Sequence, residues 1–118
     1  MELKGIPTFR ILDYKKAMNF YIDFLGFNID WEHRFKPDEP VYMQISKCGL
    51  ILHLSDNKRF QTNSVVYVDA KELDNYCSEL SHKKTDFEIP KVLETNWQTK
   101  QMEINDPFGN LLRFNEVF

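Results

Sequence analysis

The chain of 118 residues is long enough for one domain or for two small repeats that share a core, and it is too short for a separate cofactor-binding domain. Hydrophobic residues make up 42% and charged residues 28%, a balance that predicts a folded globule and excludes a disordered chain. Fifteen Lys and Arg against eighteen Asp and Glu give a net charge of −3 without a basic stripe, so we expect no nucleic-acid partner.

The first half of the sequence predicts the element order βαβββ. An apolar strand over residues 6–12 precedes an amphipathic helix that begins at Asp13 as its N-cap and ends at Gly26. Alternation of apolar and polar residues predicts a strand over residues 27–35, and two further strands over 41–46 and 50–54 follow after turns.

The strand over residues 27–35 carries an aromatic stripe. Strict alternation puts Trp31, His33 and Phe35 on one face, together with Phe27 and Ile29. Such stripes are more often buried in a core or a subunit interface than used for binding, so we expect burial. We nevertheless keep Trp31 and Phe35 as ligand-binding candidates.

The second half repeats this order. We expect a strand over residues 64–68, a helix capped by Asp69, and strands over 100–104 and 111–115, while 87–96 is too irregular to assign. A shift of 56 positions puts Asp13 on Asp69, and a shift of 60 aligns residues 49–54 with 109–114. The sequence therefore predicts a diverged duplication within a single domain, 1–118, whose modules cover about 1–60 and 61–118.

Each predicted helix covers only one face of its own half-sheet. The opposite face must meet the other half or another chain, which leaves a cleft lined by strand residues that point away from the helices. The period of the last strand in each half puts Leu52, Leu54, Leu112 and Phe114 under the helices. His53 and Arg113 then face the cleft from equivalent positions.

Several motifs together resemble the vicinal-oxygen-chelate superfamily, which includes glyoxalase I, extradiol dioxygenases, fosfomycin-modifying enzymes and bleomycin resistance proteins. They are residues 13–21, residues 24–27, and residues 106–110 followed by Phe114 and Glu116. The resemblance implies an α+β fold in which two tandem βαβββ modules form curved mixed sheets around a cleft. Residues 52–55 and Trp97 are most similar to the bleomycin resistance branch.

The metal-dependent enzymes of this superfamily place His, Glu or Gln on the first and last strands of each half. The corresponding positions here are Ile6 (or Pro7 or Thr8), His53, Ser64 and Arg113. Only His53 can bind a metal, and the permanently charged Arg113 would repel a cation. The comparison with this pattern therefore predicts no metal ligands, no cofactor and no catalytic residues.

What the resemblance implies is a small-molecule binding protein. The bleomycin resistance proteins bind and sequester bleomycin-type glycopeptide antibiotics in clefts between the subunits of a homodimer. One alternative is a metal-dependent lyase, isomerase or dioxygenase that uses His53, Glu103 or Glu116 with His33. Another is a non-catalytic interaction protein with the inherited fold. Of these functions, we favour binding over catalysis.

Six further side chains are candidates for ligand contact. His53 is either a cleft donor or acceptor or a strand histidine bonded to a neighbour, and Arg113 either holds an anionic ligand group or pairs with Glu103. Trp97 lies in a polar, irregular segment that favours stacking at the cleft rim over a core role. The remaining candidates are Tyr42, Gln44 and Gln101, polar residues on strands beside the cleft.

The sequence carries no sign of a membrane or secretory destination. No apolar run approaches the roughly 20 residues that span a bilayer, and the N-terminus has no signal-peptide pattern, so we expect a cytoplasmic protein with no membrane partner. The only cysteines, Cys48 and Cys77, lie far apart, and we expect both to stay reduced.

Overall fold

The computed structural model describes residues 1–118 and contains two four-stranded mixed sheets with few helices. The element order is βαβββ in each half, which confirms the predicted α+β fold. The elements are β1 (Thr8–Arg10), α1 (Tyr14–Ala17), the π-helix η1 (Met18–Phe24), β2 (Asn28–His33), β3 (Tyr42–Lys47), β4 (Leu50–Ser55), β5 (Val65–Asp69), α2 (Leu73–Ser81), β6 (Leu93–Glu94), β7 (Thr99–Asn105) and β8 (Leu111–Val117).

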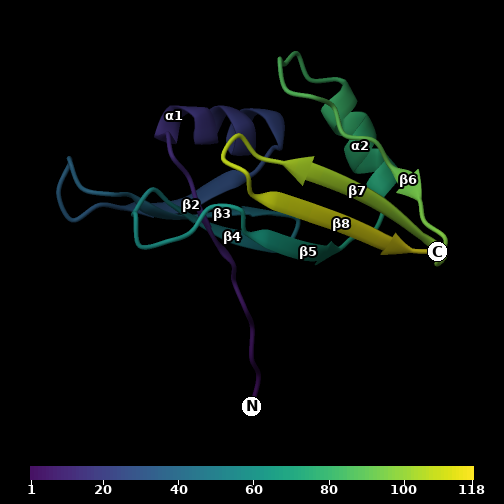
Figure 1. The fold of residues 1–118 in the computed structure, drawn as a ribbon, viewed down its shortest axis with the longest axis horizontal. Coiled ribbons are helices and arrows are strands. Elements are labelled where there is room, and N and C mark those ends of the chain that lie inside the picture. The colour runs from purple at the N-terminus through teal and green to yellow at the C-terminus, as the bar shows by residue number, and fades with distance from the viewer.

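The two sheets have the same topology. Their strand orders are β1-β4-β3-β2 and β5-β8-β7-β6, and in each the first and last strands of the half pair in parallel while the other pairs are antiparallel. Both helices lie on one side of the sheets, and the N-terminal residues extend away on the other side (Figure 1). The chain is flattened, with extents of 48 × 44 × 23 Å.

The first helix forms where the sequence predicts it. The Asp13 side chain accepts a hydrogen bond from the backbone N–H of Lys16 (2.9 Å), which satisfies one of the free donors at the helix N-terminus. The helix continues as η1 and ends before Gly26, whose φ of +85° is a left-handed conformation that favours glycine.

The predicted cap of the second helix is wrong. Asp69 is the last residue of β5, and α2 begins after Glu72. The free donors at this end bond instead to the Glu116 carboxylate of β8, which accepts from the N–H groups of Glu72 and Leu73 (3.0 Å each). A carboxylate from a distant strand thus takes the place of a local cap, and its charge suits a helix N-terminus.

The strict alternation predicted for β2 is also wrong. The strand has a β-bulge between Ile29, which pairs with Ile45, and Trp31, which pairs with Gln44. Successive residues of β3 point to opposite faces, so the bulge puts Ile29 on the helix-covered side and Trp31 on the outer side. The stripe is not buried either, since Trp31 is 42% and Phe35 is 86% exposed.

One hydrophobic core of 20 buried residues draws on both halves. Leu52, Leu54, Leu112 and Phe114 all belong to it, as their period predicts. Residues 87–96, for which the sequence predicts no regular element, supply Phe87 and the short strand β6. The Phe87 ring packs against those of Phe20 and Phe24. Burial of shared apolar surface therefore joins the halves.

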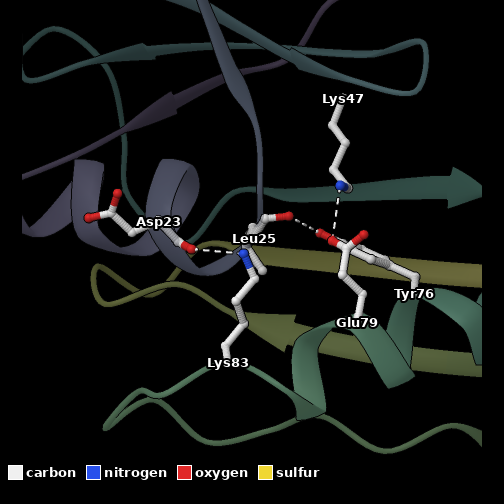
Figure 2. Close-up of polar contacts among 6 residues, drawn as sticks. All are labelled: Asp23, Leu25, Lys47, Tyr76, Glu79 and Lys83. Carbon is white, nitrogen blue, oxygen red and sulfur yellow. Dashed lines mark hydrogen bonds and ion pairs between the residues drawn. The ribbon is translucent and has the colours of Figure 1, made fainter.

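Polar contacts from α2 and the turn after it add to this junction (Figure 2). The Tyr76 hydroxyl donates to the backbone carbonyl of Leu25 (2.8 Å), Lys47 pairs with Glu79 (3.0 Å), and Lys83 donates to the carbonyl of Asp23 (3.2 Å). Burial, with smaller effects of nearby charges, raises the pKa of Tyr76 well above its usual value, so its hydroxyl stays a donor. The structure contains no helix with the length and apolar character of a membrane span.

Candidate functional site

Polar and aromatic side chains gather on the outer face of the first sheet, the face that the helices leave open. Strand register aligns Thr8 with His53, His53 with Gln44, and Gln44 with Trp31, so one row of side chains crosses all four strands. Tyr42 lies two residues before Gln44 on the same face of β3. The structure therefore brings together four predicted site residues: Trp31, Tyr42, Gln44 and His53.

Hydrogen bonds link this row into a chain with defined donors. Gln44 Oε1 carries no hydrogen, so His53 Nε2 donates to it (3.0 Å), and in the neutral ring Nδ1 is the acceptor. The Tyr42 hydroxyl donates to this Nδ1 (2.7 Å), which leaves its oxygen free to accept from the Thr8 hydroxyl (3.1 Å). The chain thus fixes both the orientation and the tautomer of the imidazole.

The aromatic rings of the row contact one another. The Trp31 ring stacks on that of Tyr42 with centroids 6.0 Å apart and planes 15° apart, and it meets the His53 ring edge-on at 5.4 Å. Partial burial lowers the pKa of His53 below its usual value of 6.5. At neutral pH this face therefore presents an uncharged imidazole beside two ordered rings, a surface on which a planar molecule can stack.

A carboxylate lies beside the rings. Asp30 occupies the bulge of β2, and its side chain accepts hydrogen bonds from Gln44 Nε2 (3.0 Å) and Ser46 Oγ (2.9 Å) on β3. Gln44 thus holds Asp30 with its amide N–H and His53 with its amide oxygen. The hydrogen-bonded row runs without interruption from Thr8 to Asp30.

The outer face of the second sheet has a different chemistry. The row equivalent to Thr8, His53 and Gln44 consists of Tyr67, Arg113 and Glu103. Arg113 Nε lies 3.8 Å from Glu103 Oε2, which is the pairing that the sequence left open, and it has no hydrogen-bond partner. Tyr67 occupies the position that the sequence comparison assigned to Ser64.

The other predicted site residues do not join the row around His53. Gln101 pairs with Asn115 in the second sheet, and Trp97 is exposed in the turn between β6 and β7, beside the C-terminus. Phe35 follows β2, and its ring meets that of His33 edge-on with centroids 5.0 Å apart. Their contact with a ligand stays a prediction.

The donor set of these rows does not fit a divalent metal. The four positions equivalent to the superfamily's ligands hold Thr8, His53, Tyr67 and Arg113, of which only His53 is a usual metal ligand at neutral pH. Both nitrogens of this imidazole already take part in hydrogen bonds within the chain. No group of three or more His, Cys, Asp or Glu side chains in the structure has a metal-binding arrangement.

Comparison with known proteins assigns the chain to a family. A sequence profile described as "Glyoxalase superfamily protein" matches residues 2–118. The chain belongs to the glyoxalase superfamily. This membership confirms the resemblance drawn from the sequence motifs. A search of curated proteins found no match.

Solved structures share this glyoxalase-superfamily fold over their whole length. A bleomycin-binding protein from Streptomyces verticillus, complexed with copper(II)-bleomycin, is 20% identical with a TM-score of 0.71, and the alignment covers 100% of this chain and 98% of that one. TnmS3, an antibiotic binding protein from Streptomyces sp. CB03234, is 19% identical with a TM-score of 0.67, covering 100% and 99%. A putative glyoxalase family protein from Bacillus anthracis is 19% identical with a TM-score of 0.64, covering 100% and 98%.

The sequence does not identify two members of the first row, Thr8 and Asp30, as site residues. The sequence does not fix the register of the first strand, so Thr8 is one of three possible positions there. Regular alternation puts Asp30 on the polar face of β2, and only the bulge moves it beside Trp31. A polar residue between two large apolar residues is the single sequence signal at this position.

Proposed function

We propose that this protein is a metal-free small-molecule binding protein of the glyoxalase superfamily, and that it sequesters a bleomycin-type antibiotic in the cytoplasm. The observation that carries the proposal is the ordered row of Thr8, Tyr42, His53 and Gln44 beside Trp31 on an open sheet face. Stacking on aromatic rings with a few fixed polar groups is typical of sites that bind planar ligands.

We further propose that a second copy completes the cleft, so that the whole chain, 1–118, acts as one domain in a homodimer. Large side chains are exposed on the outer faces of both sheets, among them Trp31, Val65 and Tyr67. Large side chains exposed on sheet faces that no helix covers are typical of an interface or a ligand site. The pockets of the single chain lie elsewhere, and none of them is lined by Trp31, Tyr42 or His53.

Calorimetric titration with bleomycin tests the binding proposal. We expect saturable binding, and we expect Trp31→Ala to weaken it by about tenfold or more because the stacking ring is lost. His82→Ala is the matched control, since His82 is exposed at the C-terminal end of α2, and it should leave the affinity unchanged. No binding of bleomycin to the wild-type protein at millimolar concentration would overturn the proposal.

Light scattering on the eluting peak of a gel-filtration column tests the dimer. We expect twice the mass of one chain. Tyr67→Glu places a charge on the exposed outer face of the second sheet and should shift the protein toward the monomer. A wild-type protein that elutes with the mass of one chain contradicts a cleft completed by a second copy.

A further inference from the structure

We propose that Asp30 makes the ligand site selective for molecules that carry a cationic group next to a planar ring. This inference rests on the proposed binding function, and it adds the charge of the ligand. It depends on the placement of Asp30, on the hydrogen bonds that hold it and on the absence of a cation beside it.

The bulge in β2 places Asp30 and Trp31 on the same face. In a regular strand consecutive side chains point to opposite faces, so a carboxylate next to an indole in sequence would lie on the far side of the sheet. Here Asp30 bonds to Gln44 and Ser46, and Trp31 pairs with Gln44 and stacks on Tyr42. Bulges of this kind redirect a side chain at the expense of local pairing.

Hydrogen bonds hold the Asp30 carboxylate in place, and no cation of the chain neutralises its charge. Its two partners, an amide N–H and a hydroxyl, are neutral, and no Lys, Arg or His forms an ion pair with it. An ionised carboxylate has about four acceptor positions, so roughly two remain open toward solvent. The ion pairs of the chain all lie elsewhere, at Lys47, Lys100 and Arg113.

The neighbouring rings add to the preference for a cation. The faces of Trp and Tyr rings attract a positive charge held within about 6 Å of their centroids. Trp31 follows Asp30 on the same face and stacks on Tyr42. Burial holds His53 neutral by lowering its pKa, so no positive charge on this row opposes a cationic ligand. A ring that stacks here would bring an attached ammonium or amidinium group to the carboxylate.

Three probes with one ring system test the inference on the full-length protein. They are naphthylmethylammonium, naphthylmethanol and naphthoate, which are cationic, neutral and anionic at neutral pH. We expect the cation to bind about tenfold more tightly than the alcohol, since an exposed ion pair and a cation–π contact together give about this factor. Added salt should reduce the preference.

Variants of Asp30 and of residues on β2 and β3 close to it separate the role of Asp30 from the effect of general charge. Asp30→Asn keeps the shape and should bring the affinities for cation and alcohol to within about twofold, and Ser46→Ala, which removes one donor to Asp30, should give an intermediate preference. Glu32→Gln is the control, because Glu32 faces the helix side, where Tyr14 donates to it. It should retain the wild-type preference.

The outcomes distinguish this inference from the function on which it rests. Equal binding of all three probes by the wild-type protein, or a preference that survives in Asp30→Asn, would overturn the role of Asp30 and leave small-molecule binding intact. Failure of every probe and of bleomycin to bind would overturn both.

Discussion

The outer faces of the two sheets hold equivalent rows with different degrees of order. In the first sheet, hydrogen bonds of 2.7–3.1 Å join Thr8, Tyr42, His53 and Gln44 into one chain. In the second sheet, the equivalent row has one ion pair, the 3.8 Å approach of Arg113 to Glu103, and its Tyr67 is 57% exposed. One face has its polar groups oriented before any ligand arrives, and the other does not.

This difference separates what the two halves have in common from what they do not. On the covered faces both halves keep large apolar residues at equivalent positions, such as Leu52 and Leu112 or Leu54 and Phe114, because a shared core tolerates little change in volume. On the outer faces an imidazole in one half corresponds to a guanidinium in the other. The covered faces of the two halves are therefore alike in chemistry, while the open faces differ.

The largest expected effect is a loss of stability in the scaffold that both faces share. The Asp106 carboxylate is buried and accepts from the Tyr21 hydroxyl, the Asn110 side chain and the backbone N–H groups of Phe108 and Asn110. We expect Asp106→Ala to lower the free energy of unfolding by about 3 kcal/mol or more, because several buried donors lose their acceptor. Urea denaturation measures this change.

The exposed neighbour of Asp106 provides the control. Asn105→Ala should stay within about 0.5 kcal/mol of the wild-type protein, because this side chain forms no hydrogen bond and is exposed. A loss of less than about 1 kcal/mol in Asp106→Ala would show that the link from Tyr21 to Asp106 does not hold the halves together.

A matched pair of hydroxyl deletions compares the two faces directly. Tyr42→Phe removes the donor to His53, so we expect a loss of about 1 kcal/mol in the free energy of unfolding. Tyr67→Phe removes a hydroxyl without a protein partner and should change stability by less than about 0.5 kcal/mol. Equal effects in thermal or urea unfolding would contradict the claim that only the first face is ordered.

The smallest expected effect is the titration of His53, which NMR can follow. Burial disfavours the charged imidazole, so its midpoint should lie below 6.5 in the folded protein and near 6.5 in the urea-unfolded chain. As the pH falls through this interval the unfolded chain binds the proton first, so the folded state loses a little stability. A midpoint at or above 6.5 would mean that the row does not hold the neutral ring.

Much of the fold could be predicted from local patterns. The Asp13 cap, the turn at Gly26 and the covered phase of Leu52 and Leu112 all follow from residues close in sequence. The start of α2 could not, because its N-terminal donors bond to Glu116, more than 40 residues away along the chain. Capping by a distant strand leaves no local signal.

The site was predictable only in part, for a similar reason. Alternation along β4 identified the outward direction of His53, and the same reasoning along β3 supports Tyr42 and Gln44. A bulge depends on how two strands pair, so alternation along β2 alone misplaced Ile29 and gave no reason to consider Asp30. The hydrogen bonds that fix the imidazole likewise depend on side chains from three strands.

The irregular pairing of β2 has a practical consequence for protein engineering. Deleting one residue from this strand would restore regular pairing. Every side chain on one side of the deletion would then point to the opposite face of the sheet, so the indole and the acid would no longer share a surface. Attempts to transplant or retune this recognition surface should therefore preserve strand length as strictly as residue identity.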